Sequence, residues 1–320
     1  MTLHTALREL IDDKLAHTVA PQWRLPIEEV RASFRALWAP SMTGAPVEVA
    51  SVEDKILHTE VGAVGVRVFT PTADGPMPIM MYFHGGGYVK GGVIETDAFC
   101  CRLAGTTGNV VVSVDYRLAP EHPYPAALTD AYHCSLWAYE NAGALGGTKD
   151  SFIVCGESAG GNLAAVICLL TRSNKEIEIS RQILLQPVVD FTLSFPSINM
   201  PGSECLVPRA DLAWYYEEYY GADADTKDFR VSPIFADDLS GLSPALIITA
   251  EHDTLRDEAK AYAERLESSG VPTKYSCYSG MVHGFLQMAA LVDEAQEAID
   301  EISLFARPDV EDPESPSVTE

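Results

Sequence analysis

The sequence predicts an α/β protein built on a doubly wound, mostly parallel sheet of eight strands with helices on both faces. Eight short segments have the composition of strands: residues 56–58, 64–69, 78–83, 110–115, 152–155, 183–186, 246–250 and 275–278. Most are continuous apolar runs rather than alternating ones, which is typical of strands buried on both faces of a parallel sheet. Helical sequences lie between the later strands, and this alternation indicates βαβ units.

The order of the elements follows from the same patterns. The first two strand segments surround Gly62 and Gly65, and we expect them to form a hairpin. Helices are expected at residues 96–106, 126–140, 160–172, 254–268 and 285–305.

Two further segments are expected to form a helical cap. Residues 1–45 are mostly helical in pattern, and an N-terminal helix there places Leu3, Leu7, Leu10, Ile11 and Leu15 near one face. Residues 191–228 combine proline breaks with the aromatic run DLAWYYEEYY, and an insertion after a strand end lies over the sheet edge where ligands bind. We therefore expect a catalytic domain at 46–306 with this cap, and a disordered tail at 307–320.

Charge and cysteine content restrict the partners and the compartment. The formal net charge of −24 argues against nucleic acid and anionic membranes as partners, because both would repel the chain. The seven cysteines include no CxxC pair and no ligand-like spacing, so we expect no metal site, no disulfide framework and a reducing cytoplasm. The sequence shows neither a secretion signal nor an apolar run of about 18 residues that could span a membrane.

A nucleophile is expected at Ser158, the centre of the sequence GESAG at residues 156–160. This segment follows an apolar strand and precedes a helical sequence, which is the strand–turn–helix setting that a G-x-S-x-G motif requires. The flanking glycines allow a tight turn that lifts the serine hydroxyl out of the sheet. The amides that begin the next helix favour developing negative charge.

The segment HGGG at residues 84–87 follows the strand at 78–83. Three consecutive glycines also suit a flexible loop. With a serine nucleophile downstream, however, backbone free of side chains allows amide N–H groups to approach a substrate oxyanion. We interpret the segment as part of an oxyanion hole, and we expect His84 to anchor the loop rather than to act in catalysis.

A serine hydroxyl needs an adjacent base, and the base needs a carboxylate that sets its tautomer. Asp253 directly follows the strand at 246–250, and His283 follows the strand at 275–278 in the same way. Both are therefore expected at the sheet edge that holds Ser158. Of the eight histidines, only His283 comes after a suitable acid and at a strand end.

Three other acids compete with Asp253 for the role of the orienting carboxylate: Glu251, Asp257 and Glu258. Asp257 and Glu258 begin a helix, where acids are favoured by the helix dipole. We interpret these two as N-terminal capping and surface charges.

Five sequence blocks carry a family resemblance: HGGGYVKG (84–91), DYRLAPEHPYPAALTDAY (115–132), GESAGGNLAA (156–165), SPALIITAEHDTLRDEA (243–259) and GMVHGF (280–285). In order and spacing they resemble the hormone-sensitive lipase family of bacterial and archaeal carboxylesterases, over about residues 55–305. The resemblance implies the α/β-hydrolase fold with a helical cap. It also implies Asp253 as the acid and three oxyanion donors, namely Gly86, Gly87 and Ala159.

Two positions depart from the family pattern. Glu157 stands where aspartate is commoner, and Thr254 stands where proline is commoner. Neither departure removes a catalytic group. By analogy with the family, a homodimer is the expected oligomeric state.

The expected function is that of a serine carboxylesterase which hydrolyses short- to medium-chain acyl esters of small molecules, without a metal or cofactor. An amidase or a deacetylase of a specific metabolite stays open, because the same machinery cleaves either bond. A non-catalytic ligand receptor is the alternative from another class; plant gibberellin receptors resemble this family but lack the triad histidine, which is present here as His283. Cap aromatics either line an acyl pocket or pack in the core: Phe34, Trp38, Trp214 and Tyr215.

Overall fold

The computed structural model describes residues 2–307 with the exception of residues 19, 39, 74 and 223. Residues 308–320, most of the expected tail, lie outside this part of the chain. The division into cap and catalytic domain stays a prediction, and the helices and strands are described below by their own bounds.

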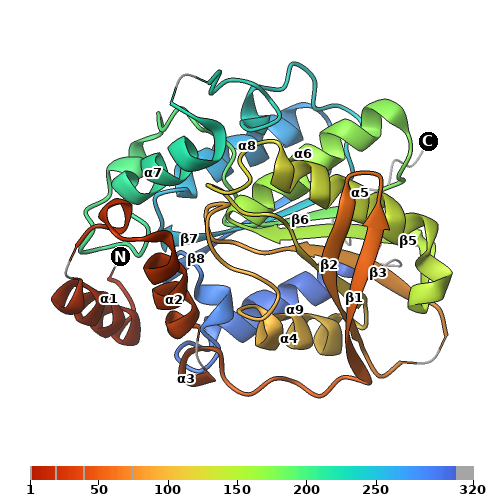
Figure 1. The fold of residues 1–320 in the computed structure, drawn as a ribbon, viewed down its shortest axis with the longest axis horizontal. Helices are drawn as coiled ribbons and strands as arrows, with labels where there is room; N and C mark the ends of the chain where they lie inside the picture. The colour runs from red at the N-terminus through yellow and green to blue at the C-terminus, as the bar shows by residue number, and fades with distance from the viewer. Residues whose placement is uncertain (1, 19, 39, 74, 223, 308–320) are drawn as a thin grey trace, which may run out of the picture.

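The centre of the fold is one sheet, which contains eight strands within the described residues. The strand order is β1-β2-β4-β3-β5-β6-β7-β8. β2 runs antiparallel to both of its neighbours, and the strands from β4 through to β8 are parallel (Figure 1). The bounds are β1 Ser51–Thr59, β2 Gly62–Thr70, β3 Met77–Phe83, β4 Val110–Asp115, β5 Gly147–Glu157, β6 Arg181–Leu185, β7 Ala245–His252 and β8 Thr273–Val282. The mostly parallel α/β fold predicted from the sequence is confirmed.

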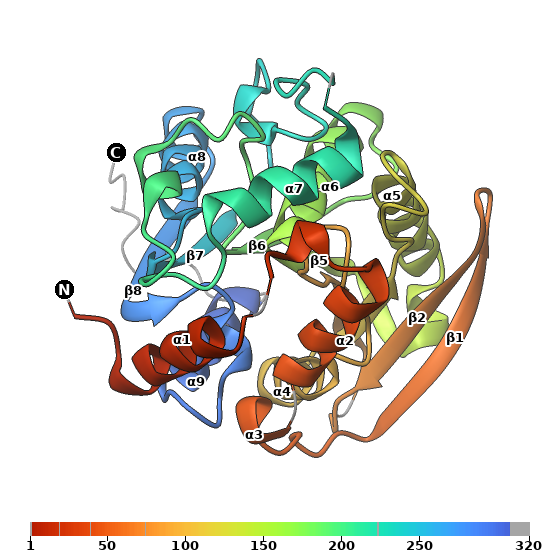
Figure 2. The same ribbon diagram turned by 60° about the vertical axis from the view of Figure 1, so that its left-hand side comes forward.

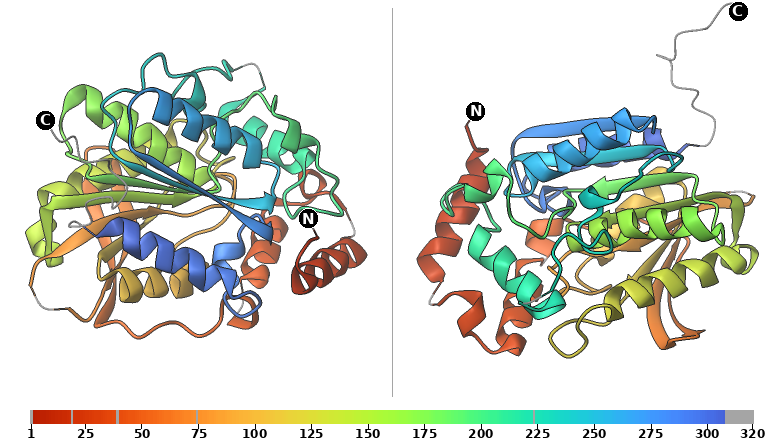
Figure 3. Two further views of the ribbon diagram at one scale, coloured as in Figure 1. Left: turned by 180° about the vertical axis from the view of Figure 1, so that it is seen from behind. Right: turned by 90° about the horizontal axis from the view of Figure 1, so that it is seen from above.

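Helices cover both faces of the sheet (Figures 1 and 3). One face packs against α5 (Ala126–Glu140), α6 (Ala159–Asn174) and α8 (Arg256–Ser268). The other packs against α4 (Asp97–Thr107) and α9 (Glu294–Ala306). Strand side chains alternate between the two cores, so that Ile79 and Met81 face the first group while Met80 and Tyr82 face the second. Continuous apolar runs are therefore required, because both faces of each central strand are buried.

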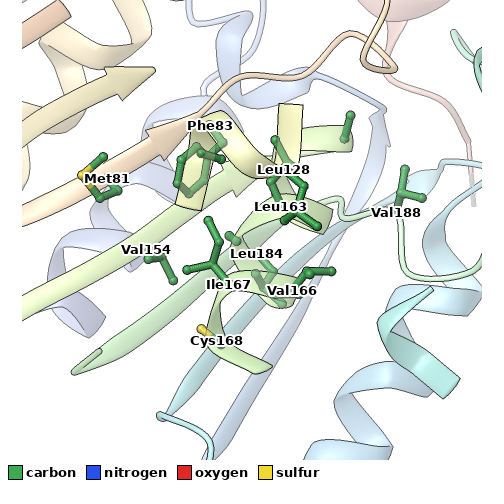
Figure 4. Close-up of a cluster of buried hydrophobic side chains, with 14 of the residues drawn as sticks. Met81, Phe83, Leu128, Val154, Leu163, Val166, Ile167, Cys168, Leu184 and Val188 are labelled. Carbon is green, nitrogen blue, oxygen red and sulfur yellow. The ribbon is translucent and has the colours of Figure 1, made fainter. Parts of the chain in front are cut away.

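The face that carries the α6 core is shown in Figure 4. Leu163, Val166 and Ile167 of α6 lie against Val154 and Leu184 of the sheet in one buried cluster. Burial of each such side chain stabilises the fold by roughly 1.5–3 kcal/mol. This packing holds the start of α6, and hence the turn that precedes it, rigidly against the sheet.

Two groups of helices lie together over the C-terminal ends of the parallel strands (Figure 2). The first comprises α1 (Thr5–His17), η1 (Gln22–Arg24), α2 (Ile27–Leu37) and α3 (Pro40–Thr43). The second comprises η3 (Pro196–Asn199) and α7 (Arg209–Tyr220). Polar contacts join the groups: Lys14 Nζ donates to Leu206 O at 2.6 Å, and Gln22 Nε2 donates to the Asp211 carboxylate at 2.7 Å.

Two local expectations are wrong. The helix predicted at 285–305 is interrupted: η5 spans Phe285–Gln287, and α9 begins only at Glu294. The Ala290 amide donates to Met42 O at 3.1 Å, so the connecting backbone bonds to the N-terminal segment instead of continuing a helix. The sequence pattern places Leu15 near the same face of α1 as Leu7 and Ile11. Leu7 and Ile11 are buried, but Leu15 is half exposed.

The remaining short elements are η2 (Ala142–Leu145) and η4 (Pro233–Phe235). All seven cysteines are free thiols, and Cys277 alone among them is exposed. In the described residues, no helix has the length and apolar character needed to cross a membrane.

Candidate active site

Ser158 occupies a strained turn between the end of β5 and the start of α6. Its φ is +56°, a left-handed value that costs a non-glycine residue about 1–3 kcal/mol. The surroundings enforce it: the Ser158 amide donates to Leu185 O at 2.8 Å, and a Cβ on Gly160 would lie 1.9 Å from Phe83 O. A Cβ on Gly156 would lie 2.1 Å from Gly160 O, so only glycine fits on either side of the serine.

Ala159 is the first residue of α6, a helix of 16 residues. The first four amides of a helix have no partner within it, and the helix dipole makes that end favourable for negative charge. The Ala159 N–H therefore belongs to a region that stabilises an anion next to the serine.

The HGGG loop follows β3 and approaches the same turn. A Cβ on Gly85 would lie 3.4 Å from Ser158 Cβ, which places the loop directly beside the serine. Gly86 and Gly87 have φ values of +119° and +64°. Added Cβ atoms would lie 2.1 Å from Lys90 O and 2.4 Å from Tyr215 Cγ respectively, so both close contacts and backbone conformation require glycine.

His84 anchors this loop. Its ring stacks on Tyr116 with a centroid separation of 4.1 Å, and its Nδ1 lies 2.7 Å from Gly85 O. Burial lowers the pKa of His84 to about 4, so the ring is neutral at physiological pH. The structural role expected for this histidine agrees with these contacts.

His283 and Asp253 are brought together at the ends of β8 and β7. His283 Nδ1 lies 2.9 Å from Asp253 Oδ2; the Asp253 side chain is fully buried, and that of His283 is 10% exposed. Asp253 Oδ1 accepts a hydrogen bond from the Leu255 amide at 2.9 Å, which holds the carboxylate in place. Burial lowers the pKa of His283, but the charge of Asp253 and its hydrogen bond outweigh burial, so the pKa lies above its ordinary value of 6.5.

Gln186 holds the backbone on both sides of His283. It directly follows β6, and its φ is +47°. Its side chain reaches the end of β8. Its Nε2 donates to Val282 O at 3.1 Å, and its Oε1 accepts from the Gly284 amide at 2.7 Å. No pattern in the sequence singles out this residue, because its partners lie 96 and 98 positions away.

Glu157, the departure from the family pattern, is buried beside the histidine. Its Oε2 accepts a hydrogen bond from Gln287 Nε2. Burial raises the pKa of this carboxyl, and the positive charge of His283 opposes that rise. Glu157 and Gln287 both line the cavity described next, so they are further site residues that the motif analysis did not identify.

A cavity of about 380 Å³ joins the predicted residues. That volume is within the range of roughly 300–1,000 Å³ typical of ligand pockets. The lining includes Ser158, His283, Gly86 and Gly87, while Asp253 lies behind His283. Three of the cap aromatics singled out from the sequence also line it, namely Phe34, Trp38 and Tyr215. The fourth, Trp214, donates its indole N–H to Glu218 at 2.9 Å.

The competing acids are bonded elsewhere. Glu251 Oε2 accepts from the Gly280 amide at 2.8 Å, and Asp257 Oδ2 accepts from the Ser197 amide at 2.9 Å. Glu258 was expected at the surface, which is wrong: it is 1% exposed and accepts bonds from the Val189 and Asp190 amides at 2.8 and 3.2 Å. A buried loop needs acceptors for its amides, and this carboxyl supplies one.

In the part of the chain that the structure describes, no cluster of three or more His, Cys, Asp or Glu side chains has an arrangement that could hold a metal ion.

Comparison with known proteins identifies the family. The alpha/beta hydrolase fold family matches residues 80–287, which is more than half of the chain. The chain belongs to this family. The resemblance to hormone-sensitive-lipase-like enzymes noted in the sequence is thereby confirmed.

Characterised relatives cover most of the chain. The carboxylic ester hydrolase LipN of Mycobacterium tuberculosis is 38% identical over 82% of this chain and 70% of its own length. An ethyl acetate hydrolase of Pseudomonas putida is 35% identical over 89% of this chain and 91% of its own. The structure of a hyperthermophilic esterase from the archaeon Pyrobaculum calidifontis superimposes with a TM-score of 0.89 at 36% identity, covering 96% of this chain and 98% of that one.

Proposed function

We propose that this protein is a serine carboxylesterase that hydrolyses short- to medium-chain acyl esters of small molecules through Ser158, His283 and Asp253. The observation that carries the proposal is the His283–Asp253 contact of 2.9 Å beside the cavity that His283 shares with Ser158. The broader class, a carboxylic ester hydrolase, is confirmed by the relatives described above.

The proton arrangement follows from the contact with the carboxylate. His283 Nδ1–H donates a hydrogen bond to Asp253, which leaves Nε2 unprotonated in the neutral ring. Nε2 takes the proton of the Ser158 hydroxyl as the serine oxygen attacks the ester carbonyl. The imidazolium then protonates the leaving alcohol, and water hydrolyses the acyl-enzyme by the same route.

The oxyanion of each tetrahedral intermediate is held by backbone amides of Gly86, Gly87 and Ala159. The first two lie in a loop where only glycine fits, and the third begins α6, so the donors are held in place before the substrate arrives. In sites of this type, one donor contributes about 3–4 kcal/mol to the stability of the transition state.

The experiment that tests the proposal combines labelling with turnover. An organophosphate should modify Ser158 and abolish hydrolysis of p-nitrophenyl butyrate. Ser158→Ala should lower kcat by several orders of magnitude, and Ser158→Ala combined with His283→Ala should be little worse, because the residues act as one unit. Circular dichroism checks that the variants are folded.

Ser135→Ala is the matched control. Ser135 is a buried serine of α5 whose Oγ donates to Ala131 O at 2.8 Å within the helix. Its replacement should leave labelling and turnover intact. Full turnover by folded Ser158→Ala protein would refute the nucleophile, and a wild-type protein that binds esters without cleaving them would be a receptor instead.

A further inference from the structure

Lys90 places an ammonium group on the wall of the cavity. It follows the HGGG loop by three residues. Its Nζ donates to Tyr215 Oη at 2.6 Å and to Gln22 Oε1 at 2.7 Å. The same nitrogen lies 4.9 Å from the ring centroids of both Phe34 and Tyr215. The group is therefore held in position by η1, α2 and α7 together.

This ammonium is buried without a bonded carboxylate. Lys90 is 8% exposed, and among the residues that the structure describes its side-chain hydrogen bonds go to Gln22 and Tyr215, neither of which is an acid. Asp211 is the nearby acid, but its Oδ2 is occupied by Gln22 Nε2 at 2.7 Å. Burial lowers the pKa of Lys90 to about 7, and the charge of Asp211 opposes this fall without cancelling it. An ammonium in this position is costly unless an anion pairs with it.

A second lysine adds to the positive charge of this wall. Lys14 also lines the cavity, and its Nζ donates to Leu206 O, an uncharged acceptor. Burial lowers the pKa of Lys14, while Asp211 raises it. Two ammonium groups thus share the one Asp211 carboxylate. The other titratable groups of the lining are His17, Glu157, Tyr215, Tyr216 and His283, and Glu157 bonds to Gln287 beside His283.

Lys90 and Ser158 line the same cavity. An added Cβ on Gly86 would lie 3.3 Å from Lys90 Cγ, so the lysine side chain begins beside an oxyanion donor. Its charge also acts on His283, whose pKa it lowers. A substituent on an ester bound at Ser158, on the acyl or the alcohol half, would therefore share the cavity with this ammonium.

We propose that this cavity selects esters that carry a carboxylate and that Lys90 binds this carboxylate. The inference rests on the proposed ester hydrolase function and names its substrate class. An ammonium has three N–H donors, of which Tyr215 and Gln22 receive two, which leaves one donor for a carboxylate of the substrate. The local positive charge is needed here because a chain of net charge −24 otherwise repels anions.

The test compares anionic esters with neutral esters of the same shape, in which an isopropyl group replaces the carboxylate. Monomethyl glutarate against methyl 5-methylhexanoate places the charge on the acyl half. 4-Acetoxybutyrate against 4-methylpentyl acetate places it on the alcohol half. The readout is the ratio of kcat/KM for the anionic ester to that for its neutral partner, measured by pH-stat at constant ionic strength.

Lys90→Met should lower this ratio by about tenfold or more in at least one pair, since a hydrogen bond to a charged group contributes about 1.5–3 kcal/mol. The pair that responds identifies the half of the ester that carries the carboxylate. A smaller fall in both pairs overturns the proposal. If Lys90 only held the cap together, its loss would slow all four esters equally and leave the ratio unchanged.

Lys260→Met is the matched control, because it removes a positive charge far from the cavity. Lys260 lies on α8, is exposed and contacts Glu264 at 3.8 Å. The ratio should not change, and an equal fall would assign the effect to overall charge and overturn the proposal.

A wild-type measurement keeps the proposal falsifiable if Lys90→Met does not fold. Glutarate should inhibit p-nitrophenyl butyrate hydrolysis competitively and more strongly than 1,5-pentanediol. Equal inhibition by the diol overturns the carboxylate site. Failure to hydrolyse any of the four esters or p-nitrophenyl butyrate would instead refute the proposed function itself, so the two failures are distinguishable.

Discussion

The side chain of Gln186 accepts a hydrogen bond from the Gly284 amide at 2.7 Å, immediately after His283. Its other end donates to Val282 O, immediately before His283. The peptide that carries His283, the proposed general base, is thereby held from both sides by one side chain of the neighbouring loop. In the proposed mechanism Gln186 is a positioning residue, because it would act through His283.

The first prediction concerns this residue. Gln186→Leu should lower kcat for p-nitrophenyl butyrate more than it changes KM, because a misplaced base affects the transition state and not the binding of the ester. Loss of stability by about 1–3 kcal/mol is also expected, since a buried amide and a buried carbonyl lose their partner.

Gln182→Leu is the control for this prediction. Gln182 is a buried glutamine of β6 whose Nε2 donates to Ser243 O at 2.9 Å, at the opposite end of the strand. That variant should lose stability but keep kcat. Equal losses of kcat in both variants would show that Gln186 is merely structural.

The second prediction concerns the orienting acid. Asp253→Asn should lower kcat by about 10⁴, because an amide favours the wrong tautomer of His283. Glu251→Gln and Asp257→Asn should have far smaller effects, since both carboxylates accept backbone amides away from the histidine. Steady-state kinetics of the three folded variants decide the order, and a larger loss in Asp257→Asn would remove Asp253 from this role.

The third prediction concerns pH. The base must be neutral to take the serine proton, so kcat/KM should fall as pH decreases through the pKa of His283. That inflection should lie above 6.5, because the charge and hydrogen bond of Asp253 outweigh the lowering by burial. A pH profile with p-nitrophenyl butyrate measures it. An inflection at or below 6.5 would mean that burial prevails over the carboxylate.

The fourth prediction concerns the length of the acyl chain. Burial of each methylene contributes about 0.8 kcal/mol, so kcat/KM should rise by at most about fourfold per methylene from acetate toward C4–C8 esters. It should then collapse, because a cavity of about 380 Å³ is finite and overfilling costs about 1–3 kcal/mol. A p-nitrophenyl ester series from acetate to palmitate tests this.

Two outcomes would contradict that prediction. A rate that still climbs at palmitate would mean that the cavity does not limit the chain. A jump in rate when the substrate passes its solubility limit would indicate activation at a lipid interface, as in a true lipase.

Several elements could be predicted because their signals are local. The run VVVSVD at 110–115 coincides with β4, since a strand buried on both faces is mostly apolar rather than alternating. The expectation of one helix over 285–305 is wrong because the local sequence carries no signal for the interruption. No proline or glycine interrupts this segment, and only the contact between Ala290 and Met42 shows why its first part is not α-helical. The expected surface position of Glu258 is wrong, because the sequence pattern of an acid at a helix start is the same whether its side chain faces water or a buried loop.

By itself, the sequence determined the mostly parallel α/β fold, the family, and the motif residues Ser158, Asp253 and His283, because strand patterns and short motifs are properties of adjacent residues. Only the tertiary structure decided how His283 is held and which charge lines the cavity. Gln186 reaches its partners across nearly 100 positions, and Lys90 meets Gln22 and Tyr215 from segments 68 and 125 positions away. Hydrogen bonds and charges between such distant segments leave no periodic pattern in the chain; they arise only when folding brings the N-terminal helices and α7 onto the edge of the sheet.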